Sequence, residues 1–417
     1  CLAFLVKQMQ TAKNYQLSIP SDTLNLTRQQ TSGGMTLLES GLIHTEIQRK
    51  WLTKLQSVKD EFQAHAAYND AHSRFPHENI DWLVKEGYTL LTLPKAYGGE
   101  GATIEDMVII QSYLGSIDGA TALSIGWHLS TAGQIFEEQK WEPHLLDQLA
   151  QAIQEGALIN RAVSEADTGS PTRGGKPSTH AKRSGSEYVL NGVKTFTSML
   201  PALTHFLVSG YNEATDQFGF FLVEKETPGV SVAETWNVVG MRATESHDLV
   251  LEDVHIPQEN FVEVAGGSKG PNGWILHIPS VYLGIAQAAA DYAKDFAKTH
   301  QPNSIDYPIG HLPTVQQSIG EMESLLLSAR AFLWSTARTY HEAPDAPVWN
   351  ETSASKILVM NQGLKVIDLA MRIVGAKSLE MDRPLQRYYR DMRAGLHNPP
   401  MEDAAYTNIA KSELNLF

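Results

Sequence analysis

The chain has 417 residues, of which 42% are hydrophobic and 19% charged, and its formal net charge at pH 7 is −14. This length and composition are those of a globular protein with two or three packed domains. Such an acidic chain is a poor partner for nucleic acid or an anionic membrane, so we expect neither. The single cysteine, Cys1, excludes an intrachain disulfide and is typical of a reducing compartment, which predicts a cytoplasmic location.

Residues 1–34 are expected to be a disordered or non-native N-terminal extension. Within them, residues 21–34 are polar and carry no period of apolar positions, so they offer nothing to pack. We favour an over-extended reading frame or a cloning remnant over a functional arm.

From Met35 the pattern predicts an N-terminal α-helical domain over residues 35–157. Apolar positions recur at helical spacing, and the segments with this spacing are 43–72, 76–90, 103–117, 119–138 and 141–156. The second of these helices should end at Gly87 and place its apolar stripe in the core. That stripe consists of Ile80, Leu83, Val84 and Tyr88.

A central β domain is predicted over residues 158–268. Asn191-Gly192 lies between two β-rich runs, which predicts a hairpin turn, and Pro228-Gly229 predicts a second turn. Further strands are expected within residues 205–209, 218–224 and 247–256.

Helical spacing returns in a C-terminal domain over residues 269–417. Two long apolar stripes predict an antiparallel helical bundle. The first stripe is Ile278, Val281, Ile285, Ala288, Tyr292 and Phe296, and the second is Ile357, Met360, Leu364, Ile367, Met371 and Val374.

Common cofactor motifs do not occur in the sequence. It has no G-x-G-x-x-G on a strand-to-helix turn, no P-loop and no G-x-S-x-G, which disfavours nicotinamide, nucleotide-triphosphate and α/β-hydrolase chemistry. No histidine pair has the spacing of metal ligands, so no metal site is predicted.

Five segments in chain order resemble the acyl-CoA dehydrogenase family. They are Ala162–Ser170 (AVSEADTGS), Asn191–Ser198 (NGVKTFTS), Gly240–Thr244 with Val250–Pro257, Ile373–Ala376 (IVGA) and Tyr389–Arg393 (YRDMR). The similarity is greatest to a bacterial subgroup without an assigned substrate. The resemblance implies an α+β protein with the acyl-CoA dehydrogenase fold: a helical domain, a central β-barrel or sandwich, and a C-terminal four-helix bundle.

The same resemblance implies a bound flavin and a set of residues that contact it. It places Ser164 at the O2/N1 side, Ser198 near N5 and O4, and Phe196 where the family has a flavin-facing Trp, and it also includes Ser170. Gly375 would approach the far end of the cofactor at a helix terminus. Structural alternatives remain open: Ser164 as a turn residue, Phe196 as β-domain core and Gly375 as a helix C-cap. Arg242 and Asn398 are the expected substrate contacts.

The usual catalytic glutamate of the family is missing. Residues 394–400 (AGLHNPP) contain no carboxylate where the family places its base, and Trp274–Pro279, the alternative position, contains none either. Asn398 could instead cap the next helix, with acids in its first turn, and we favour this over Glu402 as a displaced base.

Leu396-His397-Asn398-Pro399 resembles L-H-D-P in flavin monooxygenases of the same fold, such as dibenzothiophene monooxygenase. These enzymes also carry a histidine in an N-terminal-domain helix, where His128 lies here. In them, histidine and serine side chains act on a C4a-hydroperoxyflavin, and an imidazole suits that work because its pKa lies near neutral. The resemblance therefore makes His397, His128 and Ser198 the catalytic candidates, with structural roles for both histidines as the alternative.

Residues 300–308 lack the R-x-x-F-G with which the family contacts the FAD diphosphate. FAD is the expected cofactor, and FMN is the alternative.

Three functions stay open: an acyl-CoA dehydrogenase acting at a CH–CH group with hydride transfer to flavin N5, a two-component monooxygenase using reduced flavin, or a non-catalytic flavin- or acyl-CoA-binding protein. The implied partners are an electron-transfer protein or a flavin reductase, and a second copy in a homodimer or homotetramer.

Overall fold

The computed structural model describes residues 42–167, 177–266, 272–343 and 347–416. Residues 1–34 and Ser170, for which the sequence predicts an extension and a flavin contact, lie outside the described residues.

The N-terminal part is helical, as expected from its apolar spacing. Its helices are α2 (Glu46–Ser57), α3 (Lys59–His72), α4 (His77–Lys85), α5 (Ile104–Ile117), α6 (Gly119–Glu138) and α7 (Pro143–Gln154). The first predicted helix, 43–72, is wrong as a single element, because the chain leaves helical geometry at Val58, with φ −112°. The second predicted helix is too long: Tyr88 lies in η1 (Tyr88–Leu90), after Gly87 with φ +81°, although it is still fully buried.

The strands form one sheet in the middle of the chain. They are β1 (Ile159–Ala162), β2 (His180–Ser184), β3 (Glu187–Lys194), β4 (His205–Asn212), β5 (Gln217–Glu224), β6 (Val230–Ala233), β7 (Asp248–Pro257) and β8 (Phe261–Val264). The strand order is β6-β7-β3-β2-β4-β5-β8, with β1 paired to β4. The turn at Pro228-Gly229 is confirmed, since Gly229 has φ +91° between β5 and β6.

The predicted hairpin turn at Asn191-Gly192 is wrong. Strand β3 continues through both residues, and the pairing to β7 shifts register between Leu190 and Gly192, as in a β-bulge. Glycine is needed because a Cβ at Gly192 would lie 2.3 Å from Thr179 Oγ1. The Asn191 side chain donates to Asp253 Oδ1 at 3.1 Å across the sheet, so asparagine and glycine serve a bulge rather than a turn here.

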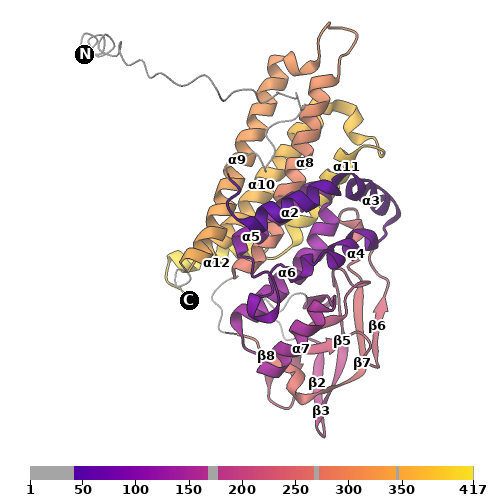
Figure 1. Cartoon of the computed structure of the whole chain (residues 1–417), viewed down its shortest axis with the longest axis vertical. Coiled ribbons are helices and arrows are strands. Elements are labelled where there is room, and N and C mark those ends of the chain that lie inside the picture. Colours follow the sequence, from indigo (N-terminus) through magenta and orange to yellow (C-terminus); the bar gives the residue numbers. More distant parts are fainter. Residues whose placement is uncertain (1–41, 168–176, 267–271, 344–346, 417) are drawn as a thin grey trace, which may run out of the picture.

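Long helices form the C-terminal part, and α8, α9 and α10 run side by side (Figure 1). The bounds are α8 (His277–Thr299), α9 (Pro313–Glu342), α10 (Trp349–Val374), α11 (Pro384–Ala394) and α12 (Glu402–Glu413). Helix α8 also packs on α5 of the N-terminal domain. A Cβ at Gly284 of α8 would lie 2.2 Å from Ser112 O of α5, so the two backbones meet closely.

Helices, sheet and bundle therefore follow one another as the sequence predicts, and the α+β architecture is confirmed. Among the helices of the described ranges, none combines the length and apolar character needed to cross a membrane.

Candidate active site

Three loops of the β domain meet beside the end of β3. They are the loop after β1 with Ser164, the turn after β3 with Phe196 and Ser198, and the loop before β7 with Arg242. Backbone hydrogen bonds join them: Thr195 N to Ser164 O (2.8 Å), Thr197 N to His247 O (3.2 Å) and Met199 N to Thr244 O (3.0 Å). The structure thus brings together Ser164, Phe196 and Ser198, which are separated by up to 34 positions in the numbering.

A buried ion pair fixes the first loop against β3. Lys194 Nζ lies 2.6 Å from Glu165 Oε1, and the lysine side chain is 0% exposed. Glu165 also accepts from the backbone N–H groups of Ser178 and Thr179. Burial lowers the pKa of Lys194, and the contact with Glu165 opposes that shift. Because Glu165 follows Ser164 and Lys194 lies two residues before Phe196, this pair sets the position of Ser164 relative to the aromatic ring.

Phe196 is held in an exposed and strained position. Its side chain is 65% exposed, so the alternative that it belongs to the β-domain core is wrong. Its φ is +57°, and Met199, Met241 and Glu245 nearby also have positive φ, at +68°, +52° and +37°. Such conformations cost roughly 1–3 kcal/mol each and concentrate at functional sites. An exposed ring on a strained turn provides an aromatic wall for a planar ligand.

Ser198 follows this ring and presents a hydroxyl. Its Oγ lies 2.8 Å from Ser246 Oγ, and its backbone carbonyl accepts from the side-chain amide of the buried Asn160 at 3.1 Å. The side chain is half-buried. Sequence reasoning missed Ser246, because a serine four residues after Arg242 carries no motif that distinguishes it from an ordinary loop serine.

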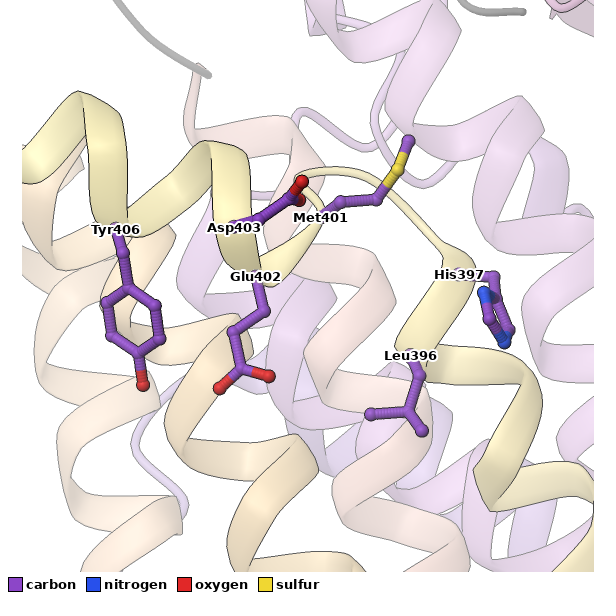
Figure 2. Close-up of a pocket in the computed structure, with 6 residues that line it drawn as sticks. All are labelled: Leu396, His397, Met401, Glu402, Asp403 and Tyr406. Atoms are coloured by element: carbon purple, nitrogen blue, oxygen red, sulfur yellow. The ribbon is translucent and has the colours of Figure 1, made fainter.

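His397 lines an open cavity of about 520 Å³ in the C-terminal domain (Figure 2). The lining residues are Leu396, His397, Met401, Glu402, Asp403 and Tyr406. The imidazole is exposed, and in Figure 2 it points away from Glu402 and Tyr406. Glu402 Oε1 accepts from Asn361 Nδ2 of α10 at 3.0 Å. Ser198 is not among the residues that line this cavity, so the cavity does not connect His397 with the turn that carries Ser198.

Asn398 anchors the loop that carries His397. Its Oδ1 accepts a hydrogen bond of 2.6 Å from the hydroxyl of Tyr282 on α8. Tyr282 is fully buried, and burial raises the pKa of its hydroxyl well above 10. The alternative that Asn398 caps the next helix is wrong, because α12 begins at Glu402 with Met401 at the N-cap position. Asn398 thus holds the loop while its neighbour His397 stays exposed.

His128 occupies a structural position inside the N-terminal domain. It is fully buried, and its Nδ1 accepts from the backbone N–H of Ile159 at 3.1 Å. Nε2 therefore carries the proton and donates to Thr89 O at 3.1 Å. Burial lowers its pKa to about 4, so the ring is neutral near pH 7. Because both nitrogens bind backbone groups, neither is open to a substrate, and we do not assign His128 a catalytic role.

His277, which sequence reasoning passed over, is the other buried imidazole of this region. It begins α8, packs edge-on against Trp127 with ring centroids 4.6 Å apart, and is fully buried. Burial lowers its pKa to about 3, so it too is neutral near pH 7. A Cβ at Gly126 would lie 2.7 Å from Nδ1 of His277, so the close packing requires a glycine at this position. A glycine in the middle of a helix is the signal in the sequence that points to this contact.

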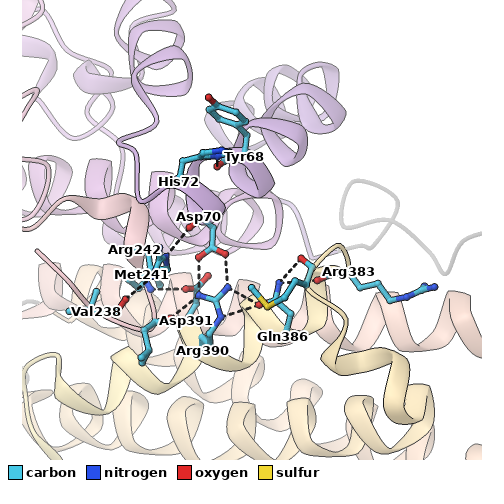
Figure 3. Close-up of polar contacts among 12 residues, drawn as sticks. Tyr68, Asp70, His72, Val238, Met241, Arg242, Arg383, Gln386, Arg390 and Asp391 are labelled. Carbon is cyan, nitrogen blue, oxygen red and sulfur yellow. Dashed lines mark hydrogen bonds and ion pairs between the residues drawn. The ribbon is translucent and has the colours of Figure 1, made fainter.

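Arg242 belongs to a polar junction between the three parts of the chain (Figure 3). Its Nε donates to Asp70 O of α3 at 2.8 Å, and its Nη1 donates to Val238 O at 3.3 Å. Asp70 in turn pairs with Arg390 of α11, whose Nη1 lies 3.0 Å from Asp70 Oδ1. A Cβ at Gly240 would lie 2.1 Å from Arg390 O, so the loop and α11 meet backbone to backbone. These contacts describe Arg242 as a residue that joins domains.

Asp391 lies in the same junction and should make stability depend on pH. Its Oδ1 accepts from Met241 N at 2.6 Å, and its pKa is raised to about 7, mainly by burial. Asp70 raises it further, whereas Arg387 and Arg390 oppose the shift. A carboxyl whose pKa is higher in the folded state binds more protons there, so the free energy of unfolding falls as pH rises from about 4 to about 7.

We expect Asp391→Asn to remove this dependence, because the amide oxygen still accepts from Met241 N but cannot ionise. The slope of the unfolding free energy between pH 4 and 7 should change by up to about 1.4 kcal/mol per pH unit. Denaturant unfolding at several pH values measures it, with the exposed Asp382→Asn as control. An Asp391→Asn protein with the wild-type slope would exclude Asp391 as the titrating group.

Gly375 ends helix α10. Its φ and ψ are +68° and −149°, a region open essentially to glycine, and its N–H bonds to Met371 O. The helix-terminating role is therefore confirmed. A Cβ there would meet no atom within 4 Å among the described residues, so backbone conformation rather than crowding requires the glycine.

Models of three domains of one protein family match the chain in order. The acyl-CoA dehydrogenase N-terminal domain matches residues 45–140, the middle domain 160–254 and the C-terminal domain 276–398. "Putative acyl-CoA dehydrogenase YdbM" of Bacillus subtilis (strain 168) is 50% identical over 371 residues, which cover 88% of this chain and 97% of that protein. The chain belongs to the acyl-CoA dehydrogenase family.

Two solved structures have the fold of this family member. Butyryl-CoA dehydrogenase from Megasphaera elsdenii superimposes with a TM-score of 0.81 at 20% identity, covering 90% of this chain and 100% of that one. KijD3 in complex with FMN and a dTDP-linked amino sugar has a TM-score of 0.79 at 22% identity, covering 92% and 97%. The predicted family and fold are therefore confirmed, as are the oxidoreductase class and the flavin cofactor at the level of the family.

The residues of this acyl-CoA dehydrogenase family member suit a flavin. The exposed Phe196 offers an aromatic face, and the half-buried Ser198 beside it offers a hydroxyl. Strain at Phe196, Met199 and Met241 is consistent with a turn shaped for a ligand rather than for packing.

Proposed function

We propose that the protein oxidises an acyl-CoA, or a related thioester, at a CH–CH group, with hydride transfer to flavin N5. The single observation that carries this proposal is the exposed Phe196 on its strained turn, next to Ser198, in a chain of the acyl-CoA dehydrogenase family. Ser164 and Ser198 would hold the flavin ring, and Gly375 would lie near the far end of the cofactor. FAD is proposed as the cofactor, with FMN as the alternative.

We assign the acid–base role to His397. The reaction requires removal of a proton from the carbon next to the thioester, and residues 394–400 contain no carboxylate. Asn398 is committed to Tyr282, whereas the His397 imidazole is exposed in the cavity. Neutral imidazole can take a proton near pH 7, which an asparagine amide cannot do.

Oxygen activation by reduced flavin is the second candidate. It is favoured by His397, a histidine in a segment that contains no carboxylate, because an imidazole can also donate a proton to an oxygen atom. A separate flavin reductase would then supply reduced flavin, whereas a dehydrogenase would pass electrons to an electron-transfer protein. A homodimer or homotetramer is proposed for either case.

The first test is flavin content. We expect the purified protein to be yellow and to release FAD or FMN on denaturation, because the family fold and the Phe196–Ser198 turn are both present. Chromatography of the released cofactor distinguishes the two flavins. A colourless protein that takes up neither flavin on reconstitution would refute the proposed function.

A second experiment separates the two candidates. Anaerobic mixing with acyl-CoAs of several chain lengths should bleach the flavin absorbance if the protein is a dehydrogenase. If it uses oxygen instead, no acyl-CoA should bleach the flavin, and chemically reduced protein mixed with oxygen should show a transient absorbance before the oxidised spectrum returns.

A further inference from the structure

We propose that Ser246 and Thr244 orient the hydroxyl of Ser198 so that its oxygen accepts a hydrogen bond from a flavin N–H instead of donating one. These two residues would thereby make the protein bind reduced flavin more tightly than oxidised flavin. The inference rests on the proposed contact of Ser198 with the flavin near N5, and it adds two positioning residues that need not touch the cofactor.

The three hydroxyls form a chain that ends on a backbone carbonyl. Ser198 Oγ lies 2.8 Å from Ser246 Oγ, which lies 2.8 Å from Thr244 Oγ1. Thr244 Oγ1 in turn lies 2.9 Å from the carbonyl oxygen of Met241. The chain of hydroxyls therefore runs from the candidate flavin surface into the loop before β7, where Met241 N donates to Asp391 of α11.

The direction of each hydrogen bond follows from counting hydrogens. A carbonyl oxygen only accepts, so Thr244 must donate its single hydroxyl hydrogen to Met241 O. Ser246 must then donate to Thr244, and Ser198 must donate to Ser246. The Ser198 oxygen retains its lone pairs and has no hydrogen left for a ligand.

Burial and backbone contacts keep this order in place. Ser246 and Thr244 are 3% and 1% exposed, so water does not compete easily for their hydroxyls. The side-chain amide of Asn160 donates to the carbonyl of Ser198, and Met199 N donates to Thr244 O. These two hydrogen bonds fix the loop of Ser198 against the loop of Thr244. Reversing the chain would lose the hydrogen bond from Thr244 Oγ1 to Met241 O, a carbonyl that also accepts from Thr244 N at 3.1 Å and Trp236 Nε1 at 3.3 Å.

Flavin N5 changes its hydrogen-bonding character with oxidation state. Oxidised flavin has a lone pair at N5 and accepts, whereas fully reduced flavin has a hydrogen at N5 and donates. An accepting Ser198 hydroxyl therefore matches the reduced form and leaves the oxidised N5 without a donor from this residue. One hydrogen bond of ordinary strength should favour reduced over oxidised flavin by about three- to tenfold in affinity.

The test is the midpoint potential of the bound flavin, with the dissociation constants of oxidised and reduced flavin as a second measurement. Ser246→Ala frees the Ser198 hydrogen, and Thr244→Val frees the Ser246 hydrogen so that it can be donated to Ser198. Both should lower the preference for reduced flavin by up to about tenfold, which lowers a two-electron potential by about 30 mV. Thr244→Ser keeps the hydroxyl and should retain the wild-type potential, as should Ser231→Ala on β6.

The outcomes separate this inference from the proposed function. If Ser246→Ala and Thr244→Val bind flavin with an unchanged or higher potential, the hydroxyl chain does not orient Ser198 and the inference is overturned, while the proposed function stands. If the wild-type protein binds no flavin, the proposed function fails first. Should Thr244→Val fold poorly, Thr244→Ser and Ser246→Ala still decide the question through their difference in potential.

Discussion

Replacing His397 by alanine is expected to lower turnover by about 10²–10⁴-fold, the usual effect of losing a general acid or base. The imidazole is exposed in its cavity, and residues 394–400 supply no other group that can take or give a proton near neutral pH. Flavin content should stay nearly unchanged, because the proposed cofactor contacts lie on the β-domain turns and not on this loop.

Rapid anaerobic mixing measures this effect directly as the rate of flavin reduction by the best acyl-CoA, and flavin absorbance gives the cofactor content. His144→Ala, which removes another exposed histidine on α7, is the control. Glu402→Gln tests the competing base in the same cavity. Reduction of the His397→Ala protein at the wild-type rate would remove His397 from the mechanism, and a slow Glu402→Gln protein would then identify the carboxylate as the base.

Replacing Lys194 by methionine should destabilise the protein by about 3–5 kcal/mol, because it removes one partner of a buried ion pair. Lys194 Nζ also donates to Ser209 Oγ at 3.0 Å, so the serine hydroxyl loses that hydrogen bond and keeps the one to Val163 O at 3.1 Å. Since this ion pair positions the Ser164 loop, we expect flavin content to fall together with stability.

Urea unfolding of the two proteins gives the difference in free energy. Lys50→Met is the matched control, because its pair with Glu100 has side-chain exposures of 46% and 19% and should contribute at most about 1 kcal/mol. Adding Glu165→Gln to Lys194→Met should restore part of the loss, because the carboxylate charge that faced Lys194 is then removed as well. Equal unfolding midpoints for Lys194→Met and wild type would show that the pair does not stabilise this loop.

Elements whose signals are local were predictable from the sequence. The stripe Ile278, Val281, Ile285 and Ala288 is buried on α8 as its spacing requires, because helix periodicity depends only on residues within a few turns. Apolar periodicity also predicted the order of helices, strands and helices. The five ordered segments predicted the family and its oxidoreductase class, and the comparisons confirm both.

Positions that depend on distant partners were decided by the tertiary structure alone. Asn191-Gly192 has the composition of a hairpin turn, yet Thr179 and Asp253, from other segments, make it a bulge inside β3. His128 resembles a catalytic histidine in sequence, but Ile159 N and Thr89 O occupy both of its nitrogens. A motif records which side chain is present, whereas its function depends on which of its atoms remain free after packing.

The candidate flavin surface shows the same division. The sequence by itself determined that Ser164, Phe196 and Ser198 are present in the order typical of the family. Only the tertiary structure showed Phe196 exposed on a strained turn, and placed Ser246 and Thr244 behind Ser198. The contact that links Ser198 to this pair joins residues 48 positions apart in sequence, Ser198 and Ser246, and no local pattern encodes such a contact.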